Sequence, residues 1–126
     1  MGTGSESSVK EEIERKAVEY LEKTNIFDKT GSLDVEAYLT NKNFSYEVAI
    51  QEYAEENFFP DDQEKFLKEV EKLRIDYMEK EDILDKTGSL DTKKYQESLT
   101  KTYNKILDEI NDIEEKIYAD KIPKPS

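Results

Sequence analysis

An internal repeat constrains the fold of this chain more than any other feature of its sequence. The segment Asp28–Asp34 reads DKTGSLD, and the same seven letters return 57 positions later at Asp85–Asp91. The same offset aligns identical residues on both sides of the segment: Glu14 with Glu71, Tyr20 with Tyr77, Ile26 with Ile83, Tyr38 with Tyr95, Tyr46 with Tyr103 and Glu52 with Glu109. Spacing that persists over such a length indicates duplication of a structural unit rather than chance reuse of one turn.

Each unit is predicted to be a pair of helices joined by DKTGSLD. Apolar residues before the first copy recur at steps of three and four, as on one face of an amphipathic helix: Val9, Ile13, Ala17, Tyr20 and Leu21. The same pattern precedes the second copy, in Phe66, Val70, Leu73 and Tyr77. We expect Ser8 and Glu11 to form a capping box, and Asp61 or Asp62 to cap the helix that follows Pro60.

The segments after the two copies differ. After the second copy, one long helix with a seam close to a heptad pattern is predicted by Leu99, Tyr103, Ile106, Ile110, Ile113 and Ile117. After the first copy, the polar run Asn41-Lys42-Asn43 predicts a break between a short helix at 33–40 and another at 45–57. The sequence therefore predicts an all-α bundle of two duplicated αα-hairpins, with four to five helices and one of them interrupted near 41–44.

This pattern also predicts the domain organisation. A chain of 126 residues suits one domain. We expect a flexible linker at 1–7, a single helical domain at 8–120 made of two repeats at about 9–57 and 61–119, and a proline-containing tail at 121–126.

The repeated heptapeptide has a structural explanation as a corner between helices. A glycine in the left-handed conformation would stop the incoming helix, and an aspartate would accept hydrogen bonds within the turn. A second aspartate, or the serine, would cap the outgoing helix, and the leucine would point back into the bundle. The expected turn residues are Asp28, Gly31, Leu33, Asp34, Asp85, Gly88, Leu90 and Asp91.

The alternating oxygen side chains of the heptapeptide also resemble the first half of an EF-hand calcium loop. They are Asp28, Thr30, Ser32 and Asp34, and the matching residues of the second copy. The resemblance ends at the sixth position, where the family has glycine and this chain has Leu33 or Leu90. The twelfth position, a bidentate glutamate in that family, is Leu39 or Gln96. We therefore expect a corner, with no bound metal or cofactor.

Composition argues against several classes of function. The net charge of −12 disfavours direct binding of nucleic acid, which needs clustered basic residues. The chain has no histidine and no cysteine, which removes the commonest general base and all thiol chemistry. No glycine-rich phosphate loop or nucleophile elbow is present, and no apolar run is long enough to span a bilayer. We expect no enzymatic activity, no catalytic residue and no transmembrane segment.

An acidic stretch beside two adjacent phenylalanines is the best candidate for a binding site. Residues 52–64 hold six acidic residues and no basic one. Because neighbouring side chains cannot both face one core, we expect one phenylalanine to seal the bundle and the other to be exposed. The predicted protein-binding residues are Glu52, Glu55, Glu56, Phe58, Phe59, Asp61 and Asp62.

The first eight residues, Met-Gly-Thr-Gly-Ser-Glu-Ser-Ser, resemble the start of a mature bacterial lipoprotein, with Met1 standing where the lipid-bearing cysteine would be. The resemblance implies an extracytoplasmic protein anchored at the cell surface by an N-terminal lipid. The leading hypothesis is a non-enzymatic, protein-binding helical domain of an exported lipoprotein.

Two alternatives remain. An acidic cytoplasmic inhibitor could imitate nucleic acid and bind a basic protein. A self-associating module could pair through the Tyr103–Ile117 seam, so we expect a monomer or a weak homodimer.

Overall fold

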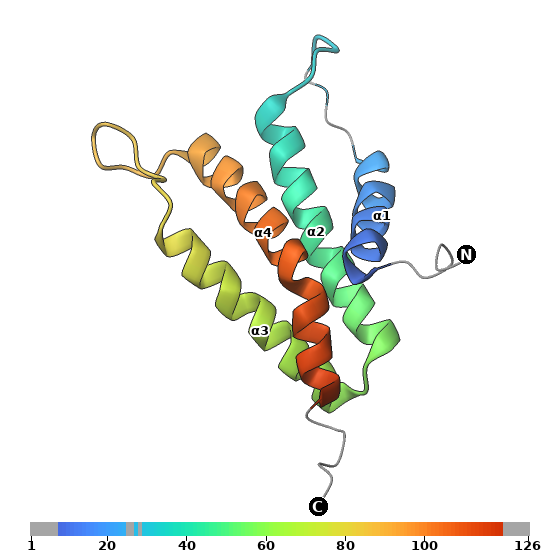
Figure 1. Cartoon of the computed structure of the whole chain (residues 1–126). Helices are drawn as coiled ribbons and strands as arrows, with labels where there is room; N and C mark the ends of the chain where they lie inside the picture. The colour runs from blue at the N-terminus through green and yellow to red at the C-terminus, as the bar shows by residue number, and fades with distance from the viewer. Residues whose placement is uncertain (1–7, 25–26, 28, 120–126) are drawn as a thin grey trace, which may run out of the picture.

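The described part of the chain folds into four helices. The computed structural model describes residues 8–24, 27 and 29–119. In chain order, the helices are α1 (Val9–Glu22), α2 (Val35–Asn57), α3 (Pro60–Glu79) and α4 (Thr92–Ala119). They pack as a bundle (Figure 1), so the predicted all-helical class is confirmed. None of these helices is long and apolar enough to cross a membrane.

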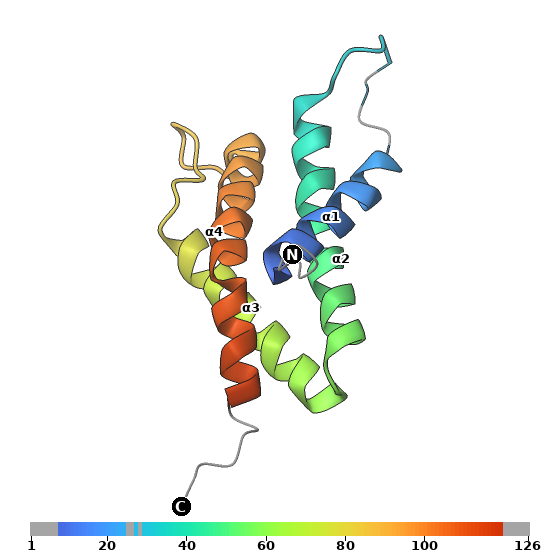
Figure 2. The same ribbon diagram turned by 45° about the vertical axis from the view of Figure 1, so that its right-hand side comes forward.

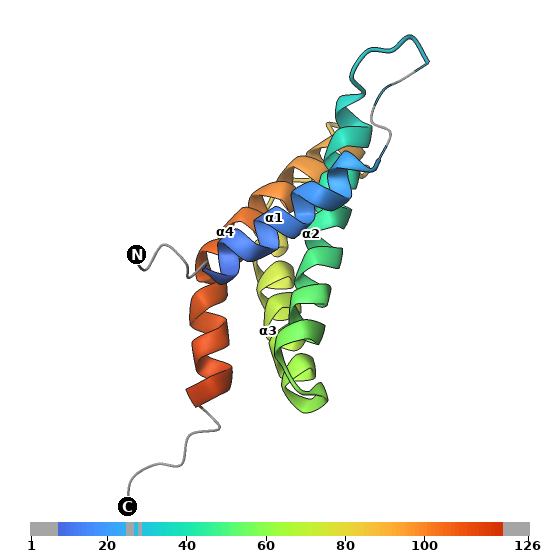
Figure 3. The same ribbon diagram turned by 90° about the vertical axis from the view of Figure 1, so that its right-hand side faces the viewer.

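The helices form two hairpins that pack side by side. α1 packs on α2, and α3 packs on α4, while α2 and α4 each also contact the helices of the other hairpin. Figures 1 and 2 show the two connections that carry DKTGSLD projecting toward the same end of the molecule. Figure 3 shows α1 lying obliquely across the bundle, over α2 and α4. The central helices α2 and α4 therefore join the two halves.

The duplication seen in the sequence is also present in the backbone. α1 ends at Glu22 and α3 at Glu79, and α2 begins at Val35 and α4 at Thr92, so both boundaries keep the offset of 57. Gly31 and Gly88 both have φ of +86°. Isolated antiparallel bridges join 27 to 33 and 84 to 90, again at equivalent positions. The two hairpins are thus copies of one structural unit.

Equivalent residues of the two hairpins also contact one another. The rings of Tyr46 and Tyr103 lie 5.7 Å apart, and the Thr100 hydroxyl donates to the Asn43 side chain over 2.7 Å. In each pair the two residues are 57 positions apart. A residue meets its own equivalent only near a twofold axis. An approximate twofold axis therefore passes between α2 and α4 at these pairs.

The core is built from the predicted apolar faces. Ile13, Phe66, Ile106 and Ile110 are fully buried, and Phe66 occupies the position equivalent to Val9. The predicted seam of α4 is buried inside the chain's own bundle, with Tyr103, Ile113 and Ile117 each less than a tenth exposed. The hypothesis of self-association through this seam is therefore wrong, since the other helices already cover it.

The predicted interruption near 41–44 is also wrong, because α2 runs through these residues. Their polar side chains bond to helical carbonyls instead of opening the backbone. Asn41 donates to the Ala37 carbonyl over 2.9 Å, and Ser45 donates to the Asn41 carbonyl over 2.8 Å. Asn43 is buried, and its amide donates to both the backbone and the side chain of Gln96 on α4.

The heptapeptide lies between the helices but works differently from the predicted corner. α1 and α3 end at the caps Lys23 and Lys80, eight residues before the glycines, so Gly31 and Gly88 do not stop them. Leu33 and Leu90 do not point into the bundle. Each forms an isolated bridge, with Phe27 or Leu84, in a connection that projects away from the helices. The two leucines are 51% and 54% exposed.

Two of the predicted aspartate roles are present in the connections. Asp34 and Asp91 cap the outgoing helices by accepting from the amides of Ala37 and Lys94. The Asp85 carboxylate accepts from the Thr87 hydroxyl and from the amides of Thr87 and Ser89, which lowers its pKa. Asp28, its counterpart, lies outside the described residues. In the second copy, this carboxylate organises its own loop.

The helix starts confirm one expected cap and correct another. Ser8 accepts from the Glu11 amide over 3.1 Å, as expected at the start of α1. Neither Asp61 nor Asp62 caps α3. The capping position is Phe59, Pro60 is the first helical residue, and both aspartates lie in the first turn. Aspartates there still favour the helix dipole.

We expect the alanine substitutions G31A and G88A each to lower the free energy of unfolding by about 1–2 kcal/mol. A methyl group at either position meets nothing within 4 Å, so the whole cost comes from the positive φ. Urea unfolding of both variants, with K86A as a neighbouring control, measures it. If one copy tolerated alanine and the other did not, the equivalence of the two loops would be contradicted.

Candidate functional site

The candidate site is the corner between α2 and α3, where the two phenylalanines separate. Phe58 is 7% exposed and packs against Phe66 and Tyr118, with ring centroids 5.0 and 5.5 Å away. Phe59 is 75% exposed. One ring seals the end of the core and the other lies on the surface, as the sequence led us to expect.

Hydrogen bonds fix the backbone of this corner. The Phe58 amide donates to the Ala54 carbonyl over 3.0 Å, which closes the last turn of α2. The Phe59 carbonyl accepts from the amides of Asp62 and Gln63, both at 2.9 Å, at the start of α3. The Gln63 side chain donates to the Phe58 carbonyl over 2.8 Å. The exposed ring of Phe59 is therefore carried by a well-bonded backbone.

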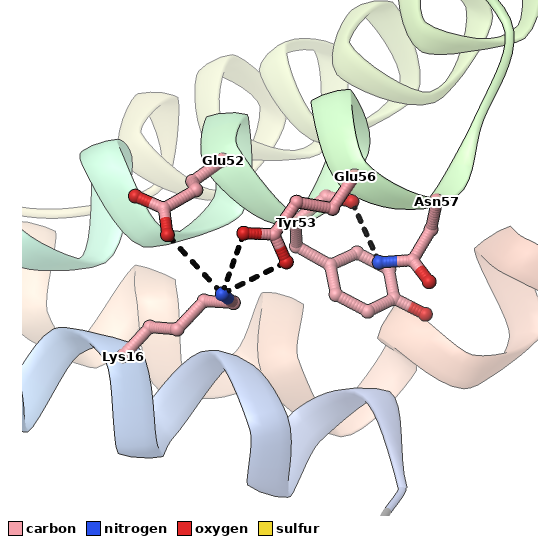
Figure 4. Close-up of polar contacts among 5 residues, drawn as sticks. All are labelled: Lys16, Glu52, Tyr53, Glu56 and Asn57. Atoms are coloured by element: carbon pink, nitrogen blue, oxygen red, sulfur yellow. Dashed lines mark hydrogen bonds and ion pairs between the residues drawn. The ribbon is translucent and has the colours of Figure 1, made fainter.

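A lysine of α1 binds part of the acidic stretch, as Figure 4 shows. The ammonium of Lys16 lies 3.2 Å from a carboxylate oxygen of Glu52 and 3.0 Å from one of Glu56. The lysine side chain is 13% exposed. Its pKa is raised, chiefly by the hydrogen bond to Glu56. One lysine thus balances part of the negative charge of two of the six acidic residues, whose side chains remain 35% and 49% exposed.

The structure therefore divides the seven predicted site residues into three groups. Glu52 and Glu56 face α1 and bind Lys16. Phe58 and Asp62 are buried. The remaining three, Glu55, Phe59 and Asp61, are exposed around the corner. The surface available to a partner is smaller than the sequence suggested.

Sequence reasoning missed Lys16, although one signal pointed to it. It lies in α1 beside Ala17, a buried residue of the apolar face. A long cation next to such a face can lie along a packed partner helix with its ammonium near the rim. The predicted hairpin pairs α1 with α2, but the register that brings Lys16 to Glu52 and Glu56 depends on the packing, which the repeat alone did not reveal.

Most of the paired tyrosines that the sequence drew attention to belong to the core or its edge. Of the three tyrosine pairs, Tyr46 and Tyr103 are buried and the other four tyrosines are half-buried. The unpaired Tyr53 is also buried, and its hydroxyl donates to Glu114 over 2.8 Å. Burial raises the pKa of all three buried tyrosines, and raises that of Tyr103 to about 12. Within the described part of the chain, no three carboxylates gather into a group that could hold a metal ion.

We expect K16M to lower the free energy of unfolding by about 1 kcal/mol, because Glu52 and Glu56 then repel each other one turn apart. The loss should shrink in 1 M salt, which screens this repulsion. The control is K68M, which removes an equal charge from an exposed pair with Glu64. Equal losses in the two variants, measured by urea unfolding, would contradict a special role for Lys16.

Stability should fall as the pH rises above 10. The unfolded chain ionises its tyrosines near pH 10, so between about pH 10 and 12 it binds fewer protons than the folded chain. The stabilisation is therefore complete below pH 10 and is lost as the pH rises through the raised pKa of Tyr103. The raised pKa values of Lys10 and Lys16 act in the same direction.

Unfolding curves at pH 8–12 measure this loss. In Y103F the loss between pH 10 and 12 should be smaller by roughly 2–3 kcal/mol, because phenylalanine does not ionise. A stability that stayed constant up to pH 12 would contradict the burial of these hydroxyl-bearing rings.

Comparison with known proteins gave no significant match to a family model, a curated protein or a solved structure.

Proposed function

We propose that the chain is a non-enzymatic helical domain that binds another protein through the α2–α3 corner. The observation that carries this proposal is Phe59, which is 75% exposed on a backbone fixed by hydrogen bonds. A large aromatic side chain held in place on the surface loses little conformational freedom on binding, and such residues often dominate the energy of protein interfaces.

The charges around Phe59 indicate the chemistry of the partner. Glu55 and Asp61 are exposed on either side of it in the sequence. Glu64 is also exposed, with its carboxylate 3.0 Å from Lys68. An aromatic contact surrounded mainly by carboxylates favours a partner with an apolar pocket and a basic rim.

We further propose a bacterial cell-surface setting, supported by the resemblance of the first eight residues to a mature lipoprotein. Labelling of the native host with a fatty acid, followed by isolation of the protein, tests this part separately. Incorporation of the label supports a lipid anchor. Its absence would remove the proposed anchor and leave the corner untouched.

The second candidate, an acidic inhibitor that imitates nucleic acid, is supported by the net charge of −12. The ion pairs of Glu52 and Glu56 with Lys16 weaken its local basis, since these carboxylates already share a partner within the chain. The salt dependence of partner binding distinguishes the two candidate functions. Binding that falls steeply with salt favours the inhibitor, whereas binding that persists favours an aromatic contact.

Substitution of Phe59 tests the corner. Affinity capture from the source organism should lose its specific partner with F59A and keep it with F44A. Phe44 is a matched control because it is also exposed, at 62%, but lies elsewhere on α2. Neither variant should change the free energy of unfolding by more than about 0.5 kcal/mol. Equal capture by F59A and the unsubstituted chain would overturn the proposal.

A further inference from the structure

A cleft of about 270 Å³ lies between α2, α3 and α4. Its apolar lining includes the buried residues Ile50 and Val70, together with Leu67. Glu47 and Glu71 are exposed at its edge, and Arg74 is half-buried beside them. The cleft therefore joins an apolar interior to a charged rim, and none of the predicted site residues lines it.

The cleft also contains a polar atom with unused bonding capacity. Tyr103 lines it and is 4% exposed, and its hydroxyl makes no hydrogen bond to another described residue. Among these residues, no buried side-chain nitrogen or oxygen lacks a partner. The hydroxyl must therefore reach solvent, and the cleft that Tyr103 lines provides the opening. A bound group could exchange hydrogen bonds with it there.

The charges of the cleft favour a cation. Two glutamates and one arginine leave a net charge of −1, and Arg74 already lies 3.9 Å from Glu71. Burial is the main cause of the raised pKa of Tyr103, and the negative charge of Glu47 raises this pKa further than the positive charge of Arg74 lowers it. The net charge of −12 of the whole chain strengthens the attraction.

We propose that this cleft binds one basic side chain, arginine in preference to lysine, from the protein partner. The aliphatic stem would lie against Ile50, Leu67 and Val70, and the guanidinium would donate to Glu47 and to the Tyr103 hydroxyl. Arginine is preferred because its planar fork can donate to two acceptors at once. The cleft is smaller than the roughly 300–1,000 Å³ typical of small-molecule sites, which suits a single side chain.

This inference rests on the proposed function and extends the same interface. Gln51, which also lines the cleft, precedes Phe58 by seven residues on α2, and Leu67 follows Pro60 by seven residues on α3. At 1.5 Å per residue, the cleft begins about 10 Å from the corner. One partner could therefore cover Phe59 and place a basic side chain in the cleft.

The first hairpin provides an internal precedent. A cleft of about 200 Å³ there is lined by Glu14 and Tyr46, the equivalents of Glu71 and Tyr103. The ammonium of the chain's own Lys42 lies 5.8 Å from the Tyr38 ring centroid and 5.9 Å from that of Tyr46. Position 99, the equivalent of 42, is leucine, so the second hairpin has no lysine there. A partner's basic side chain would take a comparable place beside Tyr103.

Titration of the full chain with N-acetylarginine amide, followed by ¹⁵N NMR, tests the proposal. Saturable shifts are expected at the amides of Gln51, Val70 and Arg74. N-acetylglutamate amide should produce none. E47Q should weaken binding about three- to fivefold, and Y103F roughly tenfold. The control is E55Q, which removes the same charge from an exposed position of α2 and should leave binding unchanged.

Three results would overturn the proposal: absence of saturable shifts at these amides, equal shifts with the acidic probe, or equal weakening by E47Q and E55Q. Y103F should fold normally, because the Tyr103 hydroxyl that it removes has no partner among the described residues. If Y103F does not fold, E47Q supplies a second test. F59A should leave probe binding unchanged. If the proposal for the cleft fails, the probe titration shows it. If the proposal for the corner fails, only partner capture with F59A shows it.

Discussion

The contact between α2 and α4 at the approximate twofold axis holds the two halves of this protein together. There the tilted rings of Tyr46 and Tyr103 contact each other, and Asn43 bonds to Thr100, so equivalent residues of the two hairpins meet. A lone pair of helices can bury only one face of each helix. Each hairpin covers the face that the other leaves exposed. The core between the two hairpins therefore contains residues that neither hairpin could bury alone.

The proposed binding surface depends on this arrangement in two ways. The corner places Phe58 inside and Phe59 outside because α2 ends and α3 begins within three residues, at Asn57 and Pro60. The cleft beside it is lined by residues of α2, α3 and α4, so both hairpins contribute to it. Both features arise where the second copy is attached to the first, because the corner and the lining of the cleft each combine residues of the two hairpins.

Much of the fold was readable from the sequence, because both periodicity and duplication are properties of the chain itself. The apolar faces of α1, α3 and α4 were predicted, and so was the separation of Phe58 from Phe59. The errors came from polar residues whose partners lie elsewhere. Asn43 looked like a helix breaker until Gln96 on α4 was seen to accept its amide protons. Lys16 and the cleft at Tyr103 were missed because both depend on the register in which separate helices pack.

The first helices of the two copies begin at different positions, and this difference affects how many partner molecules one chain could bind. If the two copies matched throughout, α3 would begin at Phe66, the equivalent of Val9 at the start of α1. It begins six residues earlier, at Pro60. This extra stretch has no counterpart before α1 among the described residues, and it carries the carboxylates that follow Phe59. Among the described residues, the corner therefore occurs once, between α2 and α3. A partner that recognises this corner would bind as one molecule per chain, despite the internal symmetry.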